Sequence, residues 1–131
     1  MNNCFVKKLA ETVDNNNLPL MPVSYDFSYC INSGLLKSNT NELEQISGYY
    51  ATDFIEIQSD YNTINFQGVF VVDNGQHRCG IAIYDSEKNI LSYSGNTGSI
   101  DLTSLSGVAY FRASTNESLK ESFRVELIDS L

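Results

Sequence analysis

Short stretches of alternating apolar and polar residues recur along most of this chain. Alternation with a period of two places successive side chains on opposite faces and is typical of β-strands. Near the C-terminus, Phe123, Val125 and Leu127 are expected on one face, with Arg124, Glu126 and Ile128 on the other. The segments expected to form strands are 25–32, 52–57, 63–72, 79–84, 90–93, 108–113 and 122–128.

Turn signals separate these segments at intervals of about ten residues, as in all-β sandwiches. Residues 73–75 read Asp-Asn-Gly, and Asn-Gly supplies the positive φ of a tight turn. Residues 85–89 and 95–98 are further turns. Seven or eight strands arranged in this way predict an all-β antiparallel β-sandwich, and one hydrophobic crossing connection near residues 100–105 favours a jelly roll. An immunoglobulin-like sandwich is the alternative, although the chain lacks the Trp that marks it.

The N-terminal segment differs from the rest of the chain. Residues 1–23 are expected to form an extended attachment arm, and residues 24–131 the β-sandwich domain. Both prolines of the chain lie in this segment, and proline interrupts helices and central strands. Its apolar side chains need a surface to cover, either this domain's own core or a neighbouring subunit. The residues expected to act in this assembly arm are Cys4, Phe5, Val6, Leu9, Leu18, Pro19, Leu20, Met21 and Pro22.

The net charge limits the kinds of partner that the protein can bind, and the cysteines indicate the compartment in which it is made. The 131 residues include 16 acidic and 8 basic side chains, and the net charge of -8 makes nucleic acid an improbable partner because phosphate binding needs clustered positive charge. No apolar run reaches the ~18 residues of a membrane helix. Residues 1–8 lack the apolar core of a signal peptide. Cys4, Cys30 and Cys79 are widely spaced and odd in number, which favours buried thiols in a protein made in a reducing cytosol.

Few residues are candidates for catalysis, and we expect that the protein is not an enzyme. His77 follows the Asn-Gly turn without a recognisable nucleophile motif, so it is interpreted as an exposed loop residue. Asp53 and Glu56 share one expected strand but point to opposite faces, so that strand alone does not make them an acid-base pair.

We expect no cofactor, with a structural calcium ion as the alternative. Asp60, Asp73, Asn74 and Asp85 lie in or near turns and carry the oxygen ligands that Ca²⁺ prefers. Turn formation explains the same residue types without a metal.

Three residues are candidates for ligand binding: Tyr50, Tyr93 and Arg112. The two tyrosines lie near expected strand ends, where a flat ring beside amide side chains could hold a sugar, although tyrosines also fill sandwich cores. Arg112 lies in the middle of an expected strand. A guanidinium there should pair with a carboxylate, with Asp53, Glu56 and Asp85 as candidates, or else contact a ligand.

An ordered series of segments between residues 50 and 128 resembles a jelly-roll module of bacteriophage structural and tail proteins and of some surface carbohydrate-binding proteins. The series is a short strand at 52–57, a long strand at 64–72, a Tyr-Asp hairpin at 81–92 and the Val-Ala-Tyr-Phe-Arg-Ala-Ser strand at 108–114. The resemblance implies a rigid scaffold without catalysis.

The function expected from this resemblance is that of a virion structural protein: a capsid decoration, collar, fibre or tail subunit. Its expected partners are other virion proteins and further copies of itself, with a trimer expected by analogy, and its expected location is the virion. The alternative is a carbohydrate-binding module that recognises host surface glycans.

Overall fold

The computed structural model describes residues 21–69, 76–95 and 97–129. Its strands are β1 (Val23–Asp26), β2 (Asn32–Ser33), β3 (Leu35–Lys37), β4 (Leu43–Glu44), β5 (Tyr49–Ala51), β6 (Ile55–Glu56), β7 (Thr63–Gln67), β8 (Arg78–Cys79), β9 (Ile81–Tyr84), β10 (Ile90–Ser94), β11 (Gly98–Asp101), β12 (Tyr110–Asn116) and β13 (Arg124–Ile128). Short 3-10 turns occur at η2 (Phe27–Tyr29), η3 (Leu102–Ser104) and η4 (Lys120–Ser122). The prediction of an all-β fold is confirmed.

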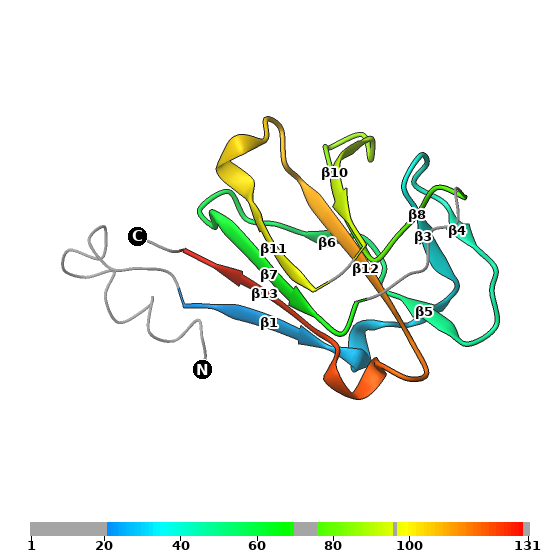
Figure 1. The fold of residues 1–131 in the computed structure, drawn as a ribbon. Coiled ribbons are helices and arrows are strands. Elements are labelled where there is room, and N and C mark those ends of the chain that lie inside the picture. The colour runs from blue at the N-terminus through cyan, green and yellow to red at the C-terminus, as the bar shows by residue number, and fades with distance from the viewer. Residues whose placement is uncertain (1–20, 70–75, 96, 130–131) are drawn as a thin grey trace.

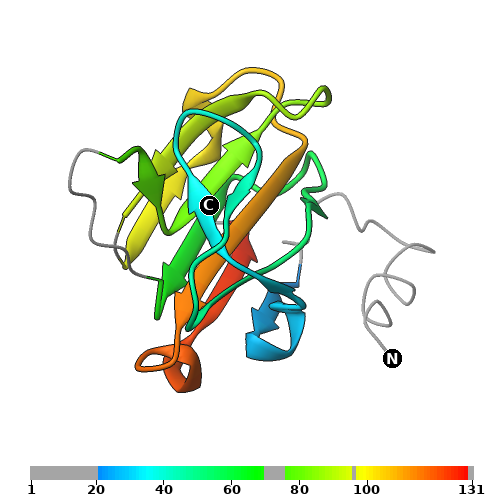
Figure 2. The same ribbon diagram turned by 90° about the vertical axis from the view of Figure 1, so that its right-hand side faces the viewer.

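The strands form three antiparallel sheets (Figures 1 and 2). A four-stranded sheet has the order β1-β13-β7-β11. A larger sheet has the order β10-β9-β12-β5-β2, with β6 also paired to β12. A small sheet has the order β4-β3-β8. The arrangement is that of a β-sandwich with an additional small sheet.

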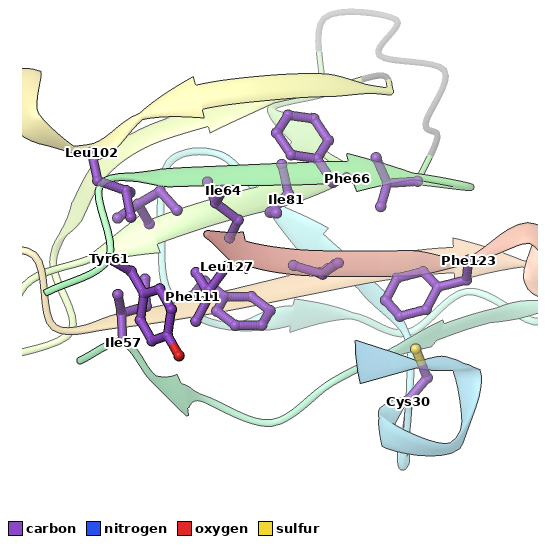
Figure 3. Close-up of a cluster of buried hydrophobic side chains, with 14 residues drawn as sticks. Cys30, Ile57, Tyr61, Ile64, Phe66, Ile81, Leu102, Phe111, Phe123 and Leu127 are labelled. Carbon is purple, nitrogen blue, oxygen red and sulfur yellow. The ribbon is translucent and has the colours of Figure 1, made fainter. Parts of the chain in front are cut away.

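The main hydrophobic core lies between the four-stranded sheet and the large sheet (Figure 3). Alternate residues of β7 and β13 face alternate residues of β9 and β12, which explains the period-two pattern of the sequence. As predicted, Phe123, Val125 and Leu127 are buried on one face of the last strand segment. The strand residues of this core include Ile64, Phe66, Ile81, Ile83, Phe111 and Ala113.

A second cluster covers the opposite face of the large sheet. Ala82 and Tyr84 of β9 point away from the main core and pack with Leu36 of β3 and Cys79 of β8. All four residues of β9 are therefore buried, because both faces of the strand are covered. A strand buried on both faces has no polar alternation, as the sequence Ile-Ala-Ile-Tyr shows.

Several expected element boundaries were wrong. Residues 98–101, expected as part of a turn and a crossing connection, form the strand β11 and pair with β7. The alternation at 25–32 predicted one strand, but the chain leaves β1 after Asp26, whose carboxylate accepts a hydrogen bond from the Ser28 backbone N–H at 3.0 Å and so starts η2. Of the segment 52–57, only Ile55–Glu56 form a strand, β6. Thr52 instead directly follows β5, and its backbone N–H donates to the carbonyl of Ala113.

Gly68 lies where two chain segments approach each other closely. Its φ is +70°, and a Cβ built there would lie 2.5 Å from the Cα of Phe123. Its carbonyl accepts a hydrogen bond from the buried Thr115 hydroxyl at 2.7 Å. Only glycine combines this backbone conformation with such a close approach between chain segments.

The described chain enters the sandwich at its edge. β1 begins at Val23 and pairs with β13, with Val23 opposite Leu127. Met21 and Pro22 are exposed, and the Met21 carbonyl accepts a hydrogen bond from the Tyr61 hydroxyl at 2.7 Å. The remaining arm residues, Cys4 to Leu20, lie outside the described residues. Within the described ranges, no helix has the length and apolar character required to cross a membrane.

Candidate functional site

A polar groove of about 780 Å³ lies beside β10, the edge strand of the large sheet. Residues 38–41, in the connection between β3 and β4, form one wall, and residues 88–93 form the other. The lining consists of Ser, Thr and Asn side chains with Ile90, Leu91, Tyr93 and one cation, Lys88, and it contains no acidic residue. This composition is unusual for a chain with a net charge of -8.

The turn between β9 and β10 shapes the second wall. The Asp85 carboxylate accepts hydrogen bonds from the backbone N–H groups of Glu87 and Asn89, both at 2.9 Å. These hydrogen bonds hold the pKa of Asp85 below its usual value, and the bond from Asn89 has the largest effect. Lys88 occupies the left-handed region with a φ of 67°. The Asp85 carboxylate, one candidate calcium ligand, is thus used by the turn that the sequence predicted.

Tyr93 lines the groove and is 54% exposed. In the strand register it lies opposite Ala82, which lies opposite Arg112. Directly paired residues of antiparallel strands project to the same face. Tyr93 therefore lies on the outer face of the large sheet, the face that carries the small sheet.

Tyr50 lies on the other face of the same sheet. It pairs with Thr115 and packs against the main core, with its ring edge-on to Phe27 at a centroid distance of 5.4 Å. Its hydroxyl donates a hydrogen bond to the carboxylate of Glu117. The structure therefore does not bring Tyr50 and Tyr93 into one site.

Arg112 is buried beneath the groove rather than in its lining. Its Nε donates to the Thr52 carbonyl at 2.9 Å, and its Nη1 donates to the Asn41 carbonyl at 3.4 Å. The guanidinium lies over the Phe54 ring, 4.6 Å from its centroid. Burial lowers the pKa of Arg112, with Tyr84 and Asp53 acting in the opposite direction.

The predicted ion pair of Arg112 with a carboxylate was wrong. No ion pair joins it to any described acidic residue, and its acceptors are backbone carbonyls. Asp53 is exposed and accepts from the Phe54 backbone N–H, Asp85 serves its own turn, and Glu56 is exposed. The aromatic ring and the two carbonyls take the place of the expected counter-ion.

The other candidates are spread over the surface or buried. His77 is exposed, as predicted, and Cys30 and Cys79 are buried, as predicted. Asp73, Asn74 and Cys4 lie outside the described residues. The described ranges contain no group of three or more His, Cys, Asp or Glu side chains that could hold a metal ion.

Large apolar side chains are exposed at the edge formed by β1, η2 and β2. Met21, Tyr29 and Ile31 are 47%, 46% and 72% exposed, and among the described residues only Tyr93 joins them as an exposed large hydrophobic residue. Among the described strands β1 pairs with β13 alone, and its other edge presents backbone hydrogen-bonding groups to any further strand. This edge is a second candidate surface, for contact with another protein chain.

Comparison with models of protein families, with curated proteins and with solved structures found no significant match to this chain.

Proposed function

We propose that the sandwich is a jelly roll of the kind found in bacteriophage structural and tail proteins. Support comes from the nested pairing of the main strands: β1 with β13, β5 with β12, β7 with β11, and β9 with β10. First thus pairs with last and the innermost two form a hairpin. Such nesting is what results when one long antiparallel hairpin wraps into two sheets.

We propose that the chain is a non-catalytic virion structural protein and that its groove at residues 38–41 and 88–93 binds a carbohydrate of the host surface. The observation that carries the binding role is the exposed ring of Tyr93 beside a wall of Asn, Ser and Thr side chains. An aromatic face packs against the C–H surface of a sugar, and amides and hydroxyls exchange hydrogen bonds with its hydroxyl groups.

Binding without turnover follows from the same lining. Glycosidic cleavage needs two carboxyl groups about 5–10 Å apart. The lining residues include no carboxylate, so this groove offers neither the acid nor the base.

A glycan array followed by calorimetric titration with a monovalent glycan tests this role. We expect Tyr93→Ala to lower the per-site affinity at least about tenfold, the loss of one good stacking contact. Tyr29→Ala is the matched control, because Tyr29 is similarly exposed but lies at another edge. Retained affinity in Tyr93→Ala, or a wild-type chain that binds no host polysaccharide, would refute the proposed groove.

The exposed apolar edge favours a second role, self-assembly within a virion. The described chain enters the sandwich at this edge, and residues 1–20 precede it in the sequence. We propose that the N-terminal segment of a neighbouring copy covers Tyr29 and Ile31 and extends the sheet beside β1. The proposed partners are therefore further copies of the chain, within a larger set of virion proteins.

Sedimentation of the full chain tests this assembly role. Ile31→Ser and Tyr29→Ser should shift an oligomeric wild type towards monomer, whereas Tyr93→Ser should leave the mass unchanged. A wild type that stays monomeric at high concentration, or variants that assemble normally, would contradict the proposal.

A further inference from the structure

The buried guanidinium of Arg112 is connected to both walls of the groove. Asn41, at the end of the first wall, accepts a hydrogen bond from Arg112 Nη1 through its backbone carbonyl. Through its side chain, the same Asn41 donates a hydrogen bond from Nδ2 to the carbonyl of Lys88, at 3.1 Å. Lys88 begins the second wall. One residue therefore joins the two walls, and Arg112 holds that residue from below.

The Phe54 ring provides a second connection between the same elements. Arg112 lies over this ring at 4.6 Å and the Lys88 ammonium lies over it at 4.9 Å. Lys88 also lies over Tyr110, at 5.6 Å. The turn that carries Lys88 is thus attached both by a hydrogen bond and by cation–π contacts to side chains packed around Arg112.

Burial of a cation without a carboxylate partner is unfavourable, because only the two backbone carbonyls and the Phe54 ring offset the loss of hydration. Arg112 keeps 6% of its surface exposed, and it is the one charged residue in the buried set of the described chain. A hydrophobic side chain of similar length would fill the same space without that cost. The network around Arg112 offers a reason for the cation. It connects Thr52, Asn41 and, through Asn41, Lys88, which lie in three separate loops.

We propose that Arg112 is a positioning residue for the groove, which acts through Asn41 and Phe54 to fix the separation of the two walls. Only the expected effect on ligand affinity rests on the proposed carbohydrate binding. The geometric part, that Arg112 fixes the separation of the walls, rests on the contacts alone. It assigns Arg112 no direct contact with a ligand.

Amide hydrogen exchange of the full chain tests the geometric part without any ligand. In Arg112→Met we expect exchange in residues 38–41 and 88–93 to accelerate about tenfold or more relative to β7 and β13, as loss of a charged hydrogen bond permits local opening. Asn41→Ala should produce the same change, with little effect on the melting temperature because Asn41 is exposed.

Phe111→Leu is the matched control for lost stability. Phe111 precedes Arg112 in β12 but points into the main core. This variant should accelerate exchange throughout the molecule without singling out the groove walls. Uniform acceleration in Arg112→Met, or unchanged exchange of residues 88–93 in Asn41→Ala, would overturn the positioning role.

The effect on affinity is measured by titration with the monovalent glycan that binds most tightly on the array. Arg112→Met and Asn41→Ala should each weaken binding about tenfold, the equivalent of one connecting interaction, while Phe111→Leu binds as the wild type. Loosened walls with unchanged affinity would overturn the link between positioning and binding. A negative array refutes the proposed carbohydrate role, and the exchange result still decides the geometric part.

Discussion

Replacement of Tyr84 by Phe should stabilise this protein. Tyr84 is fully buried in the second hydrophobic cluster, and its hydroxyl has no hydrogen-bond partner among the described residues. Burial raises the pKa of this phenol from its usual value. The folded chain therefore holds a polar group that loses its water without compensation.

The magnitude follows from the cost of an unsatisfied buried polar group, which is about 1–3 kcal/mol. Removing the oxygen leaves a small void and forfeits its dispersion contacts, a loss of about 1 kcal/mol or less for one atom. The edge-to-face contact of the ring with Phe54, at 5.0 Å, remains in the variant. We expect a net gain of about 1 kcal/mol, or a rise of about 4 °C in melting temperature for a domain of this size.

Tyr61→Phe is the matched control. Tyr61 is also buried, but its hydroxyl donates to the Met21 carbonyl at 2.7 Å. Its removal should destabilise the protein by about 1 kcal/mol, the typical net value of a hydrogen bond. The same Tyr-to-Phe change is therefore expected to raise the free energy of unfolding at one position and to lower it at the other. Urea unfolding of the wild type and both variants measures this difference. A loss of stability in Tyr84→Phe comparable to that in Tyr61→Phe would refute the reasoning.

Two further predictions concern the backbone and the charges. Gly68→Ala should destabilise the protein by at least about 3 kcal/mol, because it combines a left-handed φ with a Cβ 2.5 Å from the Phe123 backbone; chemical denaturation measures this, and near-native stability would contradict it. The Arg78 guanidinium donates to both Glu44 oxygens at 2.9 Å and holds the pKa of Glu44 below its usual value. The folded state thus binds that proton less tightly than the unfolded state. The stabilisation is present above the ordinary Glu pKa of about 4.3 and is lost as the pH falls through the lowered value, so urea titrations at several pH values should show a weaker acid dependence for Glu44→Gln.

The fold was predictable where one face of a strand is buried and the other is exposed to solvent. The segment 122–128 has this property, and its alternation matched β13. The segment 25–32 shows a similar alternation, but a local hydrogen bond from Ser28 to the Asp26 carboxylate competes with sheet pairing and ends β1. Alternation alone does not reveal such competition between side chain and backbone.

The groove was only partly predictable. Tyr93 was identified as a candidate, but no residue of the wall at 38–41 was. The two walls are joined by Asn41 and Lys88, 47 positions apart in sequence, a distance over which no local pattern reports contact.

The face on which Tyr93 lies also depends on an irregularity. The register of β10 shifts between Ile90 and Ser92, so that Ile90 opposes Tyr84 and Tyr93 opposes Ala82. Without this bulge, Ile90 and Tyr93 would project to opposite faces because they are three residues apart. An inserted residue in a strand changes the face of every residue beyond it.

The burial of the large sheet on both faces has a consequence for how this chain can diverge. All of β9 and residues 111–115 of β12 are buried, so a substitution there meets a packed neighbour, whereas every second position of β7 and β13 is half-buried or exposed. We expect deep mutational scanning to show β9 and β12 as uniformly intolerant and residues 38–40 as permissive. A new binding preference would then arise by changing these loop positions, while the central sheet keeps the same sequence.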